Sequence, residues 1–229
     1  MIGVAGTATK TSGPRTRSRR LGATQRREQL VATAQRLLAE RGYRATTMED
    51  IANAAGVTKP LLYQHFASKR ALYLELVHQT SAELLEALGT AHKRAHGPRE
   101  KVENGFGAYF ELIVTHENAF RLLFGRQAPD DPELLSAVRQ VETAVIDIIE
   151  ASMPRELQPD HRRLLAYAVI GMAEGGTRFW VEQTRREAVG NPPDTTVDDD
   201  EGTVPDDVHL MTKRVSRLAW AGLRGIDLG

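Results

Sequence analysis

The stretch from Thr58 to Lys69 concentrates side chains that could recognise the edges of DNA bases. Lys59 can donate hydrogen bonds to guanine O6 and N7, or to a phosphate oxygen. Gln64 has the amide geometry that pairs with adenine, and Leu61 could contact a thymine methyl group. These groups can act together only if one exposed element presents them, so the stretch predicts a displayed helix that contacts double-stranded DNA.

Helical spacing divides this stretch into two faces. Leu62 and Phe66 stand four residues apart and therefore share one face, which we expect to be buried. The opposite face carries polar and exposed side chains, flanked by Lys59 and His65, and consists of Pro60, Leu61, Tyr63 and Gln64.

A second short helix is predicted just before this one. Thr47 and Asp50 have the spacing of a capping box, which favours a helix whose Ile51 and Ala55 point inward. Gly56 then ends that helix at a position that commonly requires a positive φ. Two short helices joined by a glycine turn form a helix-turn-helix, whose second helix, about nine residues from Thr58, suits a major groove roughly 12 Å wide.

This motif resembles the TetR family of bacterial transcriptional regulators, over residues 24 to about 77. The matching residues are Thr46-Thr47, Ile51-Ala52, Ala55-Gly56-Val57, Leu62-Tyr63, Phe66, Ser68-Lys69 and the aliphatic run Ala71, Leu72 and Leu74. The rest of the chain matches the family only in layout. The resemblance implies a sequence-specific regulator, expected to be a repressor, that binds a palindromic operator as a dimer and is released by a small ligand.

The resemblance also implies which residues contact DNA. Tyr63, His65 and Lys69 match positions that commonly hold the sugar-phosphate backbone, so they would set register rather than sequence. Packing inside the domain core is the alternative for Tyr63, and His65 shares that ambiguity. The expected DNA-binding set is Thr47, Thr58, Lys59, Pro60, Leu61, Tyr63, Gln64, His65 and Lys69.

Helical periodicity continues along most of the chain and predicts an all-α fold of about nine helices. The first runs from Thr24 to about Arg41 and is stopped by Gly42, and Ser68 can cap a long fourth helix. We expect a flexible basic arm over residues 1–23, a helix-turn-helix domain over 24–69, and a helical effector-binding and dimerisation domain over 70–229. An acidic segment over 190–207 is expected to be a disordered loop.

The net charge of zero conceals a division between the two parts of the chain. Residues 1–75 hold 13 Lys and Arg against 5 Asp and Glu, a net charge of +8, and the remainder has −8. DNA contact should therefore be confined to the N-terminal part. Four arginines of the arm could follow an adjacent minor groove, although a merely solubilising tail is the alternative: Arg15, Arg17, Arg19 and Arg20.

The helical body offers a candidate ligand pocket with an apolar wall. An aromatic and aliphatic lining suits an apolar or acyl-type ligand, whereas ordinary core packing is the alternative for each residue. The candidates are Phe106, Tyr109, Phe110, Phe120, Phe124, Met172, Phe179 and Trp180. The last two helices carry small residues among large ones, and in the family they form the homodimer interface; the alternative is that they only complete a monomer's core.

Several classes of function find no support in the sequence. It has no glycine-rich phosphate loop, serine elbow or paired metal-ligand motif, so we expect neither an enzyme nor a metal or cofactor site. No cysteine is present, and no apolar run approaches the roughly 18 residues of a membrane span, which favours a cytoplasmic protein. A DNA-binding protein without a small-molecule effector, architectural or controlled by a protein, is the alternative function.

Overall fold

The computed structural model describes residues 22–124, 131–190 and 206–225. All but two residues of the basic arm and nearly all of the acidic segment lie outside these ranges. Every regular element within them is a helix, which confirms the all-α prediction. The helices are α1 (Ala23–Ala45), α2 (Met48–Ala54), α3 (Lys59–His65), α4 (Lys69–Arg94), α5 (Pro98–Thr115), α6 (Glu117–Phe124), α7 (Pro132–Ser152), α8 (Pro159–Gly190) and α9 (Asp206–Leu223).

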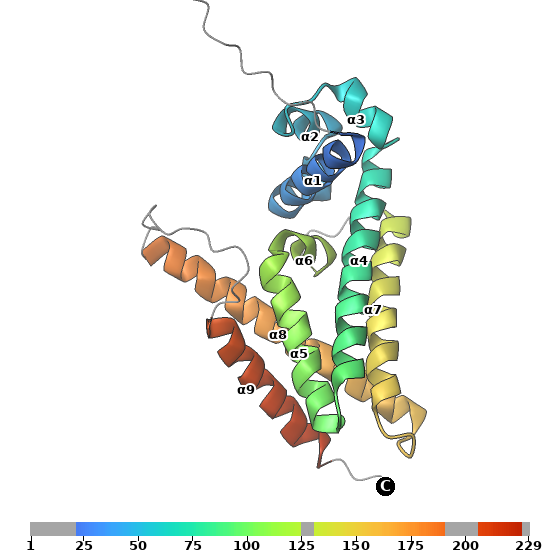
Figure 1. The fold of residues 1–229 in the computed structure, drawn as a ribbon, viewed down its shortest axis with the longest axis vertical. Helices are drawn as coiled ribbons and strands as arrows, with labels where there is room; N and C mark the ends of the chain where they lie inside the picture. Colours follow the sequence, from blue (N-terminus) through green and yellow to red (C-terminus); the bar gives the residue numbers. More distant parts are fainter. Residues whose placement is uncertain (1–21, 125–130, 191–205, 226–229) are drawn as a thin grey trace, which may run out of the picture.

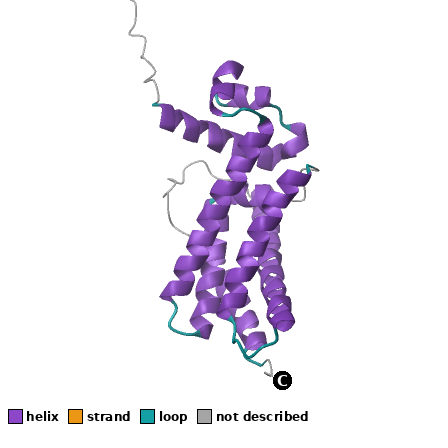
Figure 2. Cartoon of the chain, turned by 90° about the vertical axis from the view of Figure 1, so that its right-hand side faces the viewer, coloured by secondary structure: helices purple, strands orange, loops and turns teal. Residues whose placement is uncertain are grey.

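The helices form a small head, α1–α3, and a larger body, α5–α9, joined by α4 (Figure 1). Helix α4 leaves the head and runs beside α7, while α6 lies directly below α1. Figure 2 shows the long helices of the body bundled below the head. Within the described ranges, none of the helices has both the length and the hydropathy to span a bilayer.

Helix α1 differs from its expected bounds at both ends. It begins at Ala23 with Gly22 as its N-cap residue, so the predicted cap at Thr24 is wrong. It continues to Ala45, but Gly42 has φ 84° and ψ 163°, which interrupts the helical geometry where a stop was predicted. This conformation is almost restricted to glycine. The residues after Gly42 therefore turn away from the line of the helix.

The head and the first turns of α4 share one apolar core. An apolar stripe of α1 is buried, as are the residues predicted to point inward from the two short helices, because short helices gain most of their stability from packing. The core members include Leu30, Ala34, Leu37, Leu38, Ile51, Ala55, Leu62, Phe66, Leu72 and Leu76. The exposed face of α3 is thus supported from behind by fixed side chains.

Helices α5 and α8 approach closely at a glycine of the body. A Cβ atom added at Gly176 would lie 2.8 Å from Cζ of Phe110, whose side chain is fully buried. Helix α5 begins at Pro98 and ends at Thr115, and α7 begins at Pro132 after the N-cap Asp131, since proline suits the first helical position. These helices enclose the interior of the body.

Candidate nucleic-acid interface and ligand cavity

The helix-turn-helix is fixed by the local interactions that the sequence predicts. Thr47 Oγ1 accepts a hydrogen bond from the Asp50 N–H at 3.1 Å, and Asp50 Oδ2 accepts one from the Thr47 N–H at 2.8 Å. The Thr47 hydroxyl, which donates to Asp50 Oδ2 at 2.6 Å, and after it the Thr47 N–H hold the pKa of Asp50 below its ordinary value. Gly56 has φ 65°, as the turn requires. The Thr47 hydroxyl also donates to Asp50, so capping already uses its donor and one acceptor position.

Helix α3 is shorter than predicted, with seven residues from Lys59 to His65. Thr58 is its N-cap residue but makes no side-chain cap hydrogen bond, and Pro60 occupies its first turn. The backbone becomes extended at Phe66, which ends the helix. Leu62 is fully buried and Phe66 is 4% exposed, so these two side chains fix the orientation of the helix.

The outward face of α3 carries most of the residues expected to contact DNA. Tyr63 is 44% exposed, so the alternative in which its ring packs inside the head is wrong. Leu61 and His65 are partly exposed. The exposed candidates on or beside this face are Thr47, Thr58, Lys59, Pro60, Tyr63 and Gln64. Six of the nine candidates are therefore exposed, Leu61 and His65 are partly exposed, and the ninth is Lys69.

Lys59 has a partner that the sequence analysis did not identify. Its Nζ atom lies 3.5 Å from Glu49 Oε2, and both side chains are more than half exposed. Such a surface ion pair stabilises a protein by about 0–1 kcal/mol, so a phosphate or base edge can replace the carboxylate. The pair joins the starts of α2 and α3 and orients Lys59 along the outer face.

Lys69 turns inward and contacts the head, and its expected contact with a phosphate stays a prediction. Its ammonium donates to the carbonyl oxygens of Tyr43 at 2.7 Å and Thr46 at 2.8 Å, and lies 4.2 Å from the Tyr43 ring centre. Burial lowers the pKa of Lys69 from its ordinary value. Tyr43 lies in the last turn of α1 and Thr46 is its C-cap residue, so their carbonyl groups have no partner within that helix, and Lys69 satisfies them. Its neighbour Ser68 caps α4 as predicted, accepting from the Ala71 N–H at 3.0 Å.

The body encloses a cavity of about 390 Å³ between α4, α5, α7, α8 and α9. Two predicted lining residues, Phe106 and Tyr109, do contribute to its wall. The rest of the wall is mainly aliphatic, with members from each of these helices: Leu84, Leu88, Val102, Val145, Ile148, Ile149, Leu165, Val169, Ile170 and Leu223. Trp220 also lines the cavity, although the sequence analysis did not include it.

The other aromatic candidates lie elsewhere, which corrects the predicted lining. Phe110 and Phe120 are buried in the core, and Phe120 packs edge-on against Tyr109 with ring centres 5.4 Å apart. Phe179 is 59% exposed on the outside of α8. Trp180 Nε1 donates to Asp207 Oδ2 at 3.0 Å, and Met172 lies outside the lining. The side chain of Phe124 lies outside the described residues.

Ionisable side chains line this apolar cavity at a few positions. His92, Lys101 and Arg224 come from the end of α4, the start of α5 and the segment just after α9. Burial lowers the pKa of His92, and the nearby Lys101 charge lowers it further. Glu174 of α8 also lines the cavity. Within the described part of the chain, no group of three metal-ligating side chains is close enough to hold an ion.

Helices α8 and α9 expose apolar side chains to the outside of the body. Five of the six exposed large hydrophobic side chains among the described residues lie on these two helices: Leu164, Tyr167, Phe179, Leu210 and Leu218. Of the small residues singled out there, Gly171, Gly175 and Gly222 have no atom within 4 Å of an added Cβ. Gly176 and Ala219 instead face the interior of the chain.

Comparison with known proteins gives both sequence and structural relatives. FasR of Mycolicibacterium smegmatis, named a transcriptional activator, is 28% identical over 219 residues, which cover 95% of this chain and 91% of that protein. KstR2 of Mycobacterium tuberculosis, named a transcriptional repressor, is 38% identical over 91 residues, 40% of this chain and 46% of that protein. The fold is similar to that of FadR from Bacillus halodurans, with a TM-score of 0.67, 18% identity, and coverage of 90% of this chain and 99% of the other.

FadR from Bacillus subtilis, solved in complex with stearoyl-CoA, also shares the fold, with a TM-score of 0.64 and 18% identity over 87% of this chain and 99% of that one. A family model described as bacterial regulatory proteins, tetR family, matches residues 30–76, which contain the whole helix-turn-helix. The motif and the exposure of its outer face agree with this match, and the helix-turn-helix of this chain belongs to the tetR family of bacterial regulatory proteins.

Proposed function

We propose that this protein is a sequence-specific transcriptional regulator that binds an inverted-repeat operator as a homodimer and changes its DNA affinity when a small ligand enters the body. The observation that carries the proposal is the outer face of α3, exposed while Leu62 and Phe66 anchor the opposite face. In this proposal residues 24–69 form the DNA-binding domain and residues 70–229 the effector-binding and dimerisation domain, and the arm of residues 1–23 follows the minor groove.

The dimensions of α3 fit a major groove. At 1.5 Å per residue, its seven residues span about 10 Å, so the helix can lie within a groove roughly 12 Å wide. Lys59, Leu61 and Gln64 would then meet base edges, while Tyr63 and His65 hold the backbone. Thr47, Thr58 and Pro60 border the same face. The net charge of +8 over residues 1–75 supplies the attraction to phosphate.

The exposed apolar face of α8 and α9 supports a homodimer through these helices. Large apolar side chains at this density are uncommon on a monomer surface and mark an interface. The open space around Gly171, Gly175 and Gly222 would let partner helices approach closely. A two-fold dimer presents two copies of α3 and therefore matches a palindromic site with half-sites about 34 Å apart or a multiple of that spacing.

The cavity supports an amphipathic ligand with a long apolar part. Its volume of about 390 Å³ falls within the range of about 300–1,000 Å³ that is typical of small-molecule sites. The aliphatic wall suits an acyl chain, and Lys101 and Arg224 could neutralise an anionic end group. Stearoyl-CoA, which the fold relative FadR of Bacillus subtilis contains, is accordingly a suitable first probe.

Selection of bound duplexes from a random DNA pool tests the proposal directly. The expected result is an inverted repeat whose half-sites are read by the outer face of α3. Binding without sequence preference, with strong salt dependence, would refute the proposal and favour an architectural role. Repression is the predicted direction of control, and one named relative is an activator and another a repressor. A reporter gene placed behind the selected operator decides the direction.

A further inference from the structure

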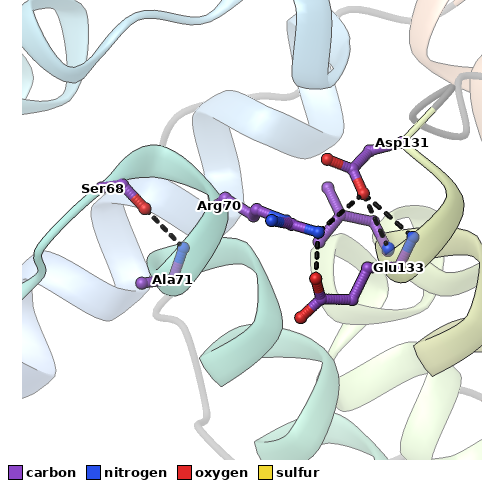
Figure 3. Close-up of polar contacts among 6 residues, drawn as sticks. Ser68, Arg70, Ala71, Asp131 and Glu133 are labelled. Carbon is purple, nitrogen blue, oxygen red and sulfur yellow. Dashed lines mark hydrogen bonds and ion pairs between the residues drawn. The ribbon is translucent and has the colours of Figure 1, made fainter.

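The first turn of α4 joins the head to the body through three consecutive residues. Ser68 caps the helix, and Lys69 donates to two carbonyl oxygens of the head, as described above. The next residue, Arg70, points the other way, toward the start of α7 in the body (Figure 3). One helical turn therefore carries a cation bound to the head beside a cation bound to the body.

Arg70 contacts the N-terminus of α7 through two carboxylates. Its Nη2 atom lies 3.3 Å from Asp131 Oδ1 and also pairs with Glu133 Oε2. The same Asp131 oxygen accepts hydrogen bonds from the N–H groups of Glu133 at 3.0 Å and Leu134 at 3.3 Å, and so caps α7. Arg70 is thus attached to the group that fixes the first turn of α7 (Figure 3).

The opposite end of α7 forms part of the cavity wall. Val145, Ile148, Ile149 and Ser152 line the cavity. With 21 residues at 1.5 Å each, α7 is about 31 Å long and runs beside α4 (Figure 1). Helix α7 therefore lines the cavity near its C-terminus and contacts Arg70 at its N-terminus. A displacement of α7 at the cavity can in this way reach the contact between Arg70 and the first turn of α7.

We infer that Arg70 is a positioning residue that makes α7 and the head move together, so that α7 transmits the state of the cavity to the DNA-binding face. The regulatory meaning of this inference rests on the proposed function, but the mechanical coupling does not. The side chains of Arg70, Asp131 and Glu133 are 44%, 31% and 59% exposed. Exposed pairs of this kind change an equilibrium by about 1.4- to 5-fold, so the contact can be broken and remade during a switch.

Distances between the head and α7 test the coupling without DNA or ligand. The chain has no native cysteine, so spin labels can be placed at Glu40→Cys on α1 and Asp147→Cys on α7, both exposed positions. The labelled full-length chain is diluted with unlabelled protein, and the distance distribution is measured by pulsed electron paramagnetic resonance. We expect one narrow distribution for the parent, which Arg70→Gln broadens or shifts.

Matched variants separate coupling from general destabilisation. Arg70→Lys, which keeps a positive charge beside Asp131 and Glu133, should keep the narrow distribution, and 1 M salt should broaden the parent distribution by reducing the range of the electrostatic attraction to about 3 Å. Arg99→Gln, which breaks an ion pair within α5, should change nothing. A distribution that stays narrow in Arg70→Gln, or one that broadens as much in Arg70→Lys as in Arg70→Gln, would overturn the inference.

The same variants give a regulatory readout with stearoyl-CoA as the probe. The quantity to compare is the operator affinity without probe divided by the operator affinity with probe. In Arg70→Gln this ratio should be about two- to fivefold closer to one than in the parent, while the affinity for the probe without DNA stays unchanged. An unchanged ratio would contradict the inference. If the probe does not bind the parent protein, the proposed ligand class is wrong, and the distance measurement still decides the role of Arg70.

Discussion

The close approach of Gly176 to Phe110 allows a quantitative test of how the body is packed. In Gly176→Ala, the new Cβ atom would lie 2.8 Å and 3.1 Å from Cζ and Cε1 of Phe110 and 3.5 Å from Cγ2 of Val215. Phe110 cannot easily retreat, because it is fully buried and its ring lies 6.0 Å from Phe106 and 5.4 Å from Tyr109. Overpacking of this kind costs about 1–3 kcal/mol.

Gly89→Ala on α4 is the matched control, because nothing lies within 4 Å of an added Cβ there. Both substitutions replace glycine inside a helix and gain about 1 kcal/mol of helix propensity. The difference in unfolding free energy between the variants therefore isolates the overpacking term, and it corresponds to about 2–12 °C in Tm for a chain of this size. Thermal unfolding at one fixed protein concentration measures it, and equal Tm values for the two variants would refute the described packing of α5 against α8.

Three further outcomes follow from the described contacts. Gln64→Ala should change the base preferred at one operator position by about 1–3 kcal/mol, measured by competition between single-base variants; an equal loss on all sequences would contradict base contact. Leu218→Glu should convert the dimer to a monomer in light scattering, since a charge would be buried at the interface, and a persistent dimer would rule out this face. Glu75 has a pKa lowered from 4.5, mainly by the hydrogen bond from Arg27, so its stabilisation is present above that value and lost as the pH falls through the lowered pKa. The Tm difference between the parent and Glu75→Gln should vanish under acid, and a constant difference down to low pH would exclude this ion pair as its source.

The sequence predicts well those features of the head that depend on near neighbours. The capping box of Thr47 and Asp50, the positive φ of Gly56 and the Ser68 cap each involve residues at most three positions apart. The buried and exposed faces of α3 follow directly from helical spacing. Lys69 differs because its carbonyl partners lie 26 and 23 residues away, at the end of α1, and only the packing of α4 against α1 brings them together.

The cavity was harder to predict because α8 has two apolar faces. One face packs inside the body and the other is exposed, so composition alone did not separate Ala173, which lines the cavity, from Phe179, which is exposed. Lys101 and Arg224 carried no local signal, since they meet only when α5 and the end of α9 come together. Helix pairing, which periodicity does not specify, decides these positions.

Photochemical crosslinking from α3 is the most direct test of the central claim that this helix enters DNA. Because the native chain lacks cysteine, a benzophenone maleimide can be attached at Gln64→Cys alone, with Asp147→Cys on α7 as the control of equal chemistry. The account predicts that illumination links the α3 label to duplex DNA carrying the selected site, whereas the α7 label gives no adduct. Equal crosslinking from both positions, or adducts from the α7 position alone, would contradict it.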